Sequence, residues 1–488
     1  MGNRPRTASI QILDNDSLLH VFYLYRPYLL GEDQAFNARL YGGNGRWARG
    51  RWWYKLAHVC QRWRTVILGS ASYLGISLVC TDGTPVADML AHSPPLPLVV
   101  DYYMNRRRIS TDDEEGLTLA LKQHDRVLRV RLNMLAGLQK FVEAMDEEYP
   151  ILEQLVIVPP IKDNSTVLRF PESLQAPHLR HLRLQGFALP IGSRLLTTAV
   201  GLATLSLVMV HPSTYFHPNA LLQWISLMPQ LETLTIYFKF STPTRDVVRQ
   251  LTHTPIIAPI TLPNLRHFDF HCVSTYSEAL VHWITTPRLK KLKIQFFNQL
   301  TFSVPHLLPF IDAAQNLRFD KASFTFSEKK VDTALYPHGE SKAYALGIVV
   351  DCWHLDWQVS SMAQISKSIS QIFSAVEFLS LQRKAQSGTS DEHNEVDRTE
   401  WRKLLRPFRN VKTLRIEEGL VKDLSRCLQL EDGELPLELL PELQTLAYFG
   451  SGRTAGAFTS FVNARQNAGR PVTLRHGYHY PTLFGAIL

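Results

Sequence analysis

The stretch PHLRHLRL, residues 177–184, carries leucines at positions 179, 182 and 184. Apolar and polar residues alternate over its last three positions, so the phrase predicts a short strand whose leucines point toward one side. The same phrase, an apolar residue followed by others three and five positions later, returns from about residue 120 onward. Its first positions are Val127, Leu152, Leu179, Leu202, Leu231, Leu265, Leu289, Val376, Val411 and Leu443.

Helix signals lie between several copies of this phrase, and some of them have a plausible N-cap residue. They begin at Asn219, Ser277 and Thr399, and a fourth has apolar residues at helical spacing from Ile365 to Phe373. One strand and one helix in every 23 to 35 residues is typical of a leucine-rich-repeat solenoid. We therefore expect an α/β fold in which an N-terminal helical domain precedes an irregular solenoid of parallel strands with helices on its convex side.

One interval in the repeat is much longer than the others. Leu289 and Val376 lie 87 residues apart, which is about three steps of the repeat. We expect this interval to hold degenerate copies of the phrase, for which SFTF (323–326) and GIVV (347–350) are candidates.

A second informative stretch, WWYKLAHVCQRWRTVI at residues 52–67, predicts a helix rich in aromatic and cationic residues. At helical spacing its apolar residues form one stripe, and its cationic residues lie off that stripe. The stripe consists of Trp52, Leu56, Val59, Cys60, Trp63 and Ile67. Nucleic-acid binding would need the arginines and tryptophans on the same exposed face, so the pattern favours a protein contact. That contact is either the ordinary core of the domain or a partner that completes the core.

Two segments of this region resemble the halves of an F-box. LDNDSLLHVF (13–22) resembles the first half, L-P-x-E-[IL]-L-x-x-[IV]-F, and differs from it at Asp14 and Ser17. LAHVCQRWRTVI (56–67) resembles the second half, V-C-x-x-W-x-x-[LIV], and a long insertion at 26–51 separates the halves. The matching residues are Leu13, Asp16, Leu18, Val21, Phe22, Val59, Cys60, Trp63 and Val66. The chain as a whole resembles large fungal F-box proteins with irregular leucine-rich repeats.

This resemblance implies that the helical domain binds a SKP-type adaptor and, through it, the cullin of a ubiquitin ligase, while the repeats bind a target protein. The expected adaptor-binding residues are Leu13, Leu18, Val21, Phe22, Leu56, Val59, Cys60 and Trp63. A unit of about 60 residues buries little of its own surface, which favours a partner over a purely structural helical cap on the solenoid. The alternative function is a leucine-rich-repeat scaffold that is not attached to a ligase.

The motifs divide the chain into four expected segments. An F-box-like helical domain covers 10–75, and a linker with the first strand covers 76–120. The solenoid covers 121–450, and a C-terminal capping segment covers 451–488.

Composition narrows the class of protein and its location. The chain has 488 residues, of which 45% are hydrophobic, and a net charge of +8 that favours acidic partners only weakly and does not indicate a nucleic-acid binder. Its 5 cysteines include no C-x-x-C pair, as is usual in a reducing compartment. No apolar run reaches the ~18 residues of a membrane helix. We expect an intracellular protein, cytoplasmic or nuclear or both, with no membrane contact.

Motifs of catalysis and cofactor binding are missing, so we expect a protein that is not an enzyme and has no cofactor. YGGNGRWARG (41–50) is neither a P-loop nor a dinucleotide-binding turn. His267, Asp269 and His271 would share one strand face and could in principle hold a metal ion. Residues two apart on a strand are separated by roughly 7 Å, which is wide for ligands of one ion. We therefore interpret them as exposed strand positions and expect no metal.

The exposed strand positions within the repeats are mainly cationic. The cations are Arg129, Arg131, Arg183, Lys291, Lys293 and Arg415, and the only anion at the same positions is Asp269. In a solenoid these side chains line the concave sheet, which is the usual binding surface. We expect these six cations to bind the target, and the target to be acidic or phosphorylated.

Overall fold

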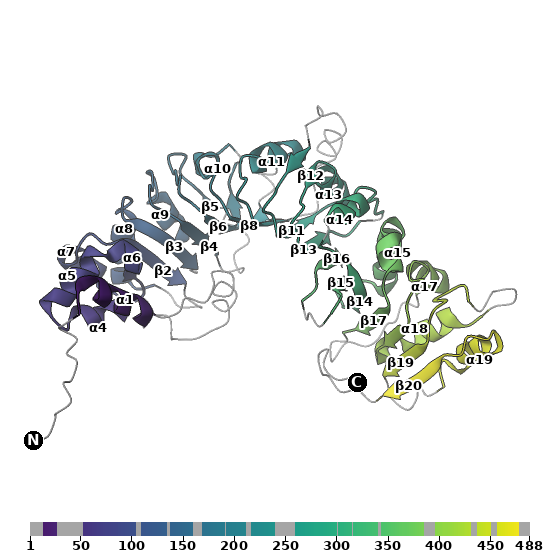
Figure 1. The fold of residues 1–488 in the computed structure, drawn as a ribbon. Helices are drawn as coiled ribbons and strands as arrows, with labels where there is room; N and C mark the ends of the chain where they lie inside the picture. Colours follow the sequence, from purple (N-terminus) through teal and green to yellow (C-terminus); the bar gives the residue numbers. More distant parts are fainter. Residues whose placement is uncertain are drawn as a thin grey trace, which may run out of the picture. The chain divides into compact units, whose positions relative to one another are not determined.

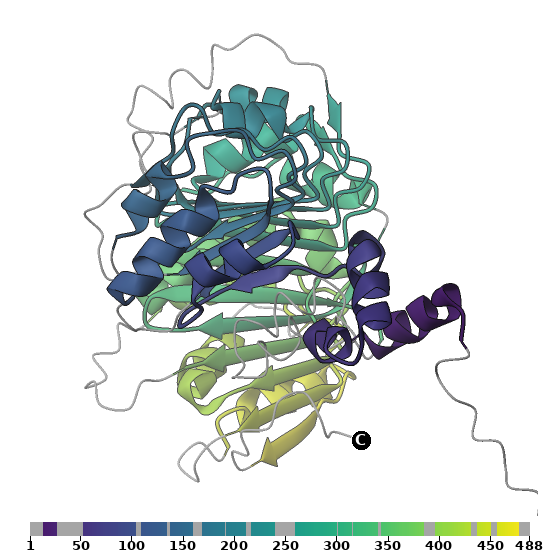
Figure 2. The same ribbon diagram turned by 90° about the vertical axis from the view of Figure 1, so that its left-hand side faces the viewer.

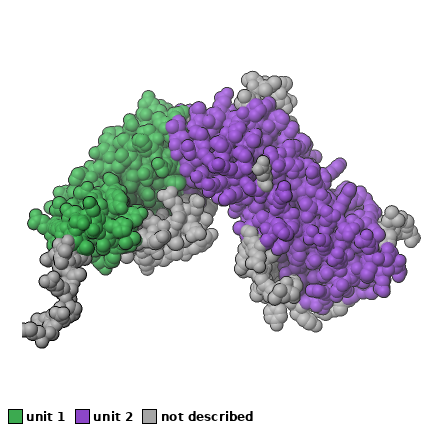
Figure 3. Space-filling model, viewed as in Figure 1, with its two compact units in different colours: residues 1–182, 194–199 green, residues 183–193, 200–488 purple. Residues whose placement is uncertain are grey.

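The computed structural model describes most of the chain as two compact units, which Figure 3 colours separately. Unit 1 comprises Met1–Leu182 and Arg194–Ala199, and unit 2 comprises Arg183–Ser193 and Val200–Leu488. The expected segment boundaries at 75, 120 and 450 stay predictions. The described residues are 13–26, 52–103, 109–133, 137–159, 168–190, 192–210, 216–239, 259–299, 301–314, 316–339, 343–384, 396–430, 437–449 and 456–477.

Unit 1 begins with short helices, of which α1 packs on α5. In Figure 2 the helix in the darkest purple, α1, lies beside the helices that follow it in the chain. The side chain of Asp14 accepts a hydrogen bond from the backbone N–H of Ser17 at 2.6 Å and so caps α1, which explains why Asp is tolerated at this position. The bounds are α1 (Asn15–Tyr25), α4 (Trp52–Ala57), α5 (Gln61–Gly69) and α6 (Ala71–Leu74).

The prediction of one continuous helix over 52–67 is wrong. The chain leaves the helical conformation after Ala57, and Cys60 becomes the extended N-cap residue of α5. The predicted stripe is not buried along its whole length, since Trp52 and Ile67 are buried and Val59 is exposed. Cys60 is exposed, although it belongs to the predicted apolar stripe.

The rest of unit 1 is a parallel sheet in which β1, β2, β3 and β4 pair in chain order. Apolar residues lie in register across it, as in the buried pairs Val100–Val130 and Leu132–Ile157. The strands are β1 (Leu78–Cys80), β2 (Leu98–Tyr103), β3 (Val127–Asn133), β4 (Gln154–Ile157) and the short β5 (Leu168–Arg169). The helices are α7 (Val86–His92), α8 (Thr111–Leu121), α9 (Leu138–Glu143) and α10 (Arg194–Thr198), and β6 (His181–Gln185) crosses the boundary between the units.

The first part of unit 2 repeats this arrangement with longer strands. Leu234, Phe268 and Leu292 lie side by side in three successive parallel strands, and all three are buried. Helices lie along one side of these strands (Figure 1). The strands are β7 (Phe187–Ala188), β8 (Thr204–Val210), β9 (Thr233–Phe238), β10 (Ile260–Thr261), β11 (His267–Cys272), β12 (Ile284–Thr285) and β13 (Lys291–Phe296). The helices are α11 (Pro218–Ile225), α13 (Ser274–Val281) and α14 (Leu307–Ala313).

The long interval after β13 contains both predicted strands, but they are not two further copies of a parallel repeat. SFTF lies in β14 (Phe319–Phe326) and GIVV in β16 (Leu346–Asp351), and β15 (Lys330–Pro337) pairs antiparallel with both. The strand order is β13-β16-β15-β14-β17. A connection of three residues between β14 and β15 allows only an antiparallel return, and this short loop overrides the repeat pattern.

After this antiparallel meander of β14, β15 and β16, parallel pairing resumes and continues to the last described strand. The buried guanidinium of Arg465 donates to the backbone carbonyls of Leu440, Pro441 and Leu443 at 3.0 to 3.2 Å and ties α19 to the loop before β19. The strands are β17 (Phe378–Arg383), β18 (Thr413–Ile416), β19 (Thr445–Phe449) and β20 (Thr473–Gly477). The helices are α15 (Leu355–Ser368), α16 (Ser370–Ser374), α17 (Arg398–Leu405), α18 (Glu418–Leu428) and α19 (Thr459–Asn467). Within the described part of the chain, no helix combines the length and the apolar character needed to span a bilayer.

A buried carboxylate joins two helices of unit 2. Glu278 of α13 is 9% exposed, and its Oε2 atom accepts the backbone N–H of His306 at 2.7 Å, next to the first turn of α14. Its Oε1 atom has no hydrogen-bond partner among the described residues. Burial raises the pKa of this carboxyl to about 7, although the backbone N–H groups of His306 and Leu307 act in the opposite direction.

This raised pKa predicts a pH dependence of stability. The folded state favours protonated Glu278, so its stabilising contribution is complete below the ordinary pKa of 4.5 and is lost as the pH rises through about 7. Glu278→Gln keeps a neutral acceptor, so it should stabilise the protein at pH 8 by on the order of 1 kcal/mol and have little effect at pH 4.5. Thermal melts of both proteins across this range measure the difference. A constant difference at every pH would contradict the account.

Candidate functional site

The predicted adaptor-binding residues fall into three groups by exposure. Leu18 and Phe22 are 0% and 1% exposed and form the core of the helical segment, where the rings of Phe22 and Trp63 pack edge to face at 4.9 Å. Val21 and Val59 are 41% and 58% exposed, and Cys60 is exposed as well. Leu13, Leu56 and Trp63 are partly exposed.

Other large apolar residues of these helices are also exposed and were not predicted as site residues. Leu24 is 69% exposed, and the rings of Tyr23 and Tyr73 contact each other at 5.4 Å on the surface. Isolated exposed apolar residues are normal, but several on so short a helical segment favour a protein contact. We call this set the helical apolar surface; it consists of Val21, Tyr23, Leu24, Tyr25, Val59 and Tyr73. Val21 and Val59 were predicted from the F-box-like motifs, and the sequence signal for Tyr23, Leu24 and Tyr25 is the apolar run at the end of α1.

Polar contacts fix α1, which carries most of the helical apolar surface, to α5. The Nε atom of Arg62 in α5 donates to the side-chain oxygen of Asn15 at 3.0 Å, and its Nη2 atom donates to the carbonyl of Leu13. Arg62 therefore joins the start of α5 to the start of α1. This cation lies outside the apolar stripe, where it holds the two segments together.

The predicted cations of unit 1 are paired with carboxylates. Arg131 lies opposite Asp101 of β2 in the strand register, and its Nη1 atom is 3.1 Å from Oδ2 of Asp101. Arg129 lies 3.6 Å from a carboxylate oxygen of Glu153. Arg183, another of the predicted cations, belongs to unit 2.

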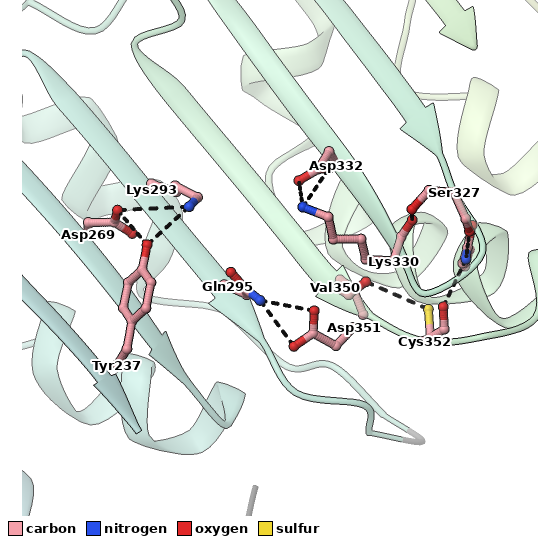
Figure 4. Close-up of polar contacts among 11 residues, drawn as sticks. Tyr237, Asp269, Lys293, Gln295, Ser327, Lys330, Asp332, Val350, Asp351 and Cys352 are labelled. Atoms are coloured by element: carbon pink, nitrogen blue, oxygen red, sulfur yellow. Dashed lines mark hydrogen bonds and ion pairs between the residues drawn. The ribbon is translucent and has the colours of Figure 1, made fainter. Parts of the chain in front are cut away.

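Three neighbouring strands of unit 2 contribute a compact polar group, shown in Figure 4. Tyr237 of β9 donates its hydroxyl to Oδ2 of Asp269 in β11 at 2.7 Å, and Lys293 of β13 donates to the Tyr237 oxygen at 3.1 Å. The ammonium of Lys293 is 3.9 Å from the same carboxylate oxygen. We call these residues the Tyr–Asp–Lys group; their positions follow from the strand register, because Asp269 lies directly opposite Lys293.

The environment of this group shifts the pKa of two of its members. Burial, and next the charge of Asp269, raise the pKa of Tyr237 well above its usual range, so its hydroxyl stays a neutral donor. Burial also raises the pKa of Asp269, and the charge of Lys293 opposes that rise. The arrangement fixes three side chains on the sheet and presents a mixed polar face.

Lys291 lies against an aromatic ring. Its ammonium is 4.3 Å from the centre of the Tyr344 ring, and burial lowers its pKa. Space for this ring comes from Gly347, since a Cβ atom there would lie 2.9 Å from Cε2 of Tyr344. The Tyr344 ring therefore partly shields the ammonium of Lys291 from solvent.

The two histidines and the aspartate that could have bound a metal make other contacts. His271 points to Asp351 of β16, with 3.1 Å between Nε2 and Oδ2, and Gln295 donates to both oxygens of the same carboxylate. The Nδ1 atom of His267 lies 3.5 Å from the Thr233 hydroxyl. Over the described residues, no group of three or more His, Cys, Asp or Glu side chains is arranged to hold a metal ion.

The six cations and one anion were counted only at the positions of the repeat phrase. Other strands add Asp101, Asp332 and Asp351, and they also add Lys321 and Lys330. Asp101 pairs with Arg131, and Asp332 is 2.9 Å from Lys330. The face is of mixed charge where these strands contribute to it.

The remaining two predicted cations belong to unit 2. Arg183 lies in β6, and its positive charge lowers the pKa of Tyr237 against the stronger effects of burial and Asp269. The guanidinium of Arg415 in β18 stacks on the ring of Phe449 at 4.4 Å.

A scan of this sequence against models of known protein families found no match, and a search of curated proteins found none either. The interpretation of the helical apolar surface and of the sheet face therefore depends on the residues themselves.

The Tyr–Asp–Lys group predicts a measurable cost for removing one hydroxyl. In Tyr237→Phe, both Asp269 and Lys293 lose their common partner, so the free energy of unfolding should fall by about 1–2 kcal/mol. Tyr73→Phe is the control, because Tyr73 is exposed and, among the described residues, makes only a ring contact. Denaturant unfolding of both variants tests this, and equal effects would show that the network adds no stability.

Proposed function

We propose that this chain is the substrate-recognition subunit of a SKP–cullin–F-box type ubiquitin ligase. The helical segment binds the SKP-type adaptor, and the strand-and-helix repeats, which resemble irregular leucine-rich repeats, bind the target protein. The chain itself carries out no chemistry. It holds the target near the ligase and so raises the effective concentration of the target at the site of ubiquitin transfer.

The observation that carries the proposal is the helical apolar surface at the position of the F-box-like motifs. Val21 and Val59 match the motifs and are exposed, although both are large apolar residues. Complete burial of such a side chain stabilises a complex by roughly 1.5–3 kcal/mol, so a partner that covers this surface gains considerable free energy. Leu18, Phe22 and Trp63 support the surface from within by packing α1 on α5.

The mixed polar face of the sheets supports the second half of the proposal. Parallel strands with helices along one side leave their other side for a partner, as in repeat proteins that bind along a sheet. The side chains there are held by defined contacts, such as the Tyr–Asp–Lys group, and are therefore preorganised for binding.

Adaptor binding should depend on exposed residues of the helical segment. We predict that Val21→Asp combined with Val59→Asp abolishes binding of a purified SKP-type adaptor, because each carboxylate would lose its hydration in the complex. Both positions are exposed, so the variant should fold. The matched control is Val200→Asp with Leu227→Asp, at two apolar positions of similar exposure in unit 2.

The assay is a pull-down with the adaptor together with a thermal melt. Loss of binding in the first variant alone, with an unchanged melt, is the expected result. Failure of the native chain to bind any SKP-type adaptor would contradict the ligase assignment and favour a repeat scaffold that is not attached to a ligase. Equal binding by native chain and variant would show that the helical apolar surface is not the docking site.

A further inference from the structure

Two arginines share one row on the last three strands of unit 2. Arg415 of β18 lies in register with Ala447 of β19, and Ala447 lies in register with Arg475 of β20. Because the strands are parallel and in register, the two arginines project from the same face, with the small Ala447 between them. Two strand spacings place their Cα atoms roughly 10 Å apart.

The guanidinium of Arg415 is held by an aromatic stack. It lies 4.4 Å from the centre of the Phe449 ring. This ring in turn lies close over Gly477 of β20, where a Cβ atom would be 2.8 Å from Cε1 of Phe449. Only glycine leaves room for the ring in this position. The Phe449 ring therefore contacts Gly477 and also the guanidinium of Arg415. We call them the Arg415 stack.

Stacking on a ring uses the flat side of a guanidinium and leaves its in-plane N–H groups for an anion. Among the described residues, Arg415 makes no hydrogen bond or ion pair, and its Nε atom is buried without a partner. Arg475 is exposed and likewise pairs with no carboxylate in that part of the chain. Arg131 and Lys293 differ from these two arginines, because they contact the carboxylates of Asp101 and Asp269.

Hydroxyl groups accompany the two arginines. Thr413, Thr445 and Thr473 form the adjacent row, in register across the same three strands and two residues before the arginine row. Threonine hydroxyls donate hydrogen bonds to carboxylate and phosphate oxygens, and guanidinium groups add charge and bidentate geometry. The β18–β20 face thus combines two cations with neutral donors, and none of its residues on these two rows is acidic.

We propose that the face formed by Arg415, Arg475 and this threonine row binds a protein segment that carries carboxylate or phosphate groups. The spacing of the arginines suits two anionic groups on one extended segment better than one small ion. That this segment belongs to a ubiquitination target rests on the proposed function, whereas binding itself does not. Phe449 and Gly477 are positioning residues, since they orient Arg415 without reaching the ligand.

The test uses the full chain and three fluorescein-labelled probes in a fluorescence anisotropy assay. They are hexaglutamate, a hexapeptide of alternating phosphoserine and glycine, and hexaglutamine as the neutral control. We expect the two anionic peptides to bind and hexaglutamine not to bind, with affinity falling as salt rises. The ratio of the two anionic affinities tells whether carboxylate or phosphate is preferred.

Arg415→Gln combined with Arg475→Gln should weaken binding of the preferred peptide at least about tenfold, because two charge-assisted contacts are lost. Arg409→Gln is the matched control; this exposed arginine lies in the turn before β18 and should leave affinity unchanged. Phe449→Leu should weaken binding while Arg415 is still present. A purely structural role of Phe449 would lower the melting temperature without changing affinity for the peptide.

Several results would overturn the proposal. They are no binding of either anionic peptide by the native chain, equal affinity in the double arginine variant, and equal weakening in Arg409→Gln. A fourth probe, a labelled single-stranded DNA hexamer, tests the alternative: tighter binding of this DNA than of either peptide would also overturn the proposal, in favour of a nucleic-acid site. None of these outcomes depends on the adaptor, so failure here is distinguishable from failure of the ligase assignment.

Discussion

The alternation of buried and outward-facing side chains along parallel strands is the constraint on which the rest of the structure depends. Leu234, Phe268 and Leu292 are buried in register, so every second residue of each strand is fixed toward the helices. The residues between them must then face the other way, in rows across neighbouring strands. Asp269 therefore lies beside Lys293, and the Tyr–Asp–Lys group is a direct consequence of packing on the opposite face.

The same constraint explains how the antiparallel meander is accommodated. β16 joins β13 in parallel register, and Ile348 and Val350 continue its buried rows. Asp332 and Asp351 then project to the polar face and pair with Lys330 and with His271 and Gln295. The meander thus adds these two carboxylates, together with Lys321 and Lys330, to a face that is cationic in the repeats alone. On the last three described strands, Arg415 and Arg475 meet no such carboxylate among the described residues.

The sequence predicts those elements whose pattern is local. The strands at the repeat phrase are present, and the predicted helices correspond to α11, α13, α15 with α16, and α17. The capping and periodic apolar residues that define them lie within about ten residues of each other.

Features that depend on distant pairing were not predictable in this way. Asp101 meets Arg131 only because β2 pairs with β3, and β2 lacks the repeat phrase. His271 and Asp351 are 80 residues apart in the sequence and meet only because the meander reverses the strand order. The break at Cys60 was missed because helical spacing continues through it, although the helix does not. Buried and exposed members of the motif, such as Phe22 and Val21, also look alike in sequence.

The central claim is that the helical segment is a docking surface separate from the repeats. Hydrogen exchange of the full chain, measured by mass spectrometry with and without a purified SKP-type adaptor, tests it most directly. The account predicts that the adaptor slows exchange within 13–26 and 52–74 and leaves the strands of unit 2 unchanged. Slowed exchange in those strands alone, or unchanged exchange throughout at saturating adaptor, would contradict it.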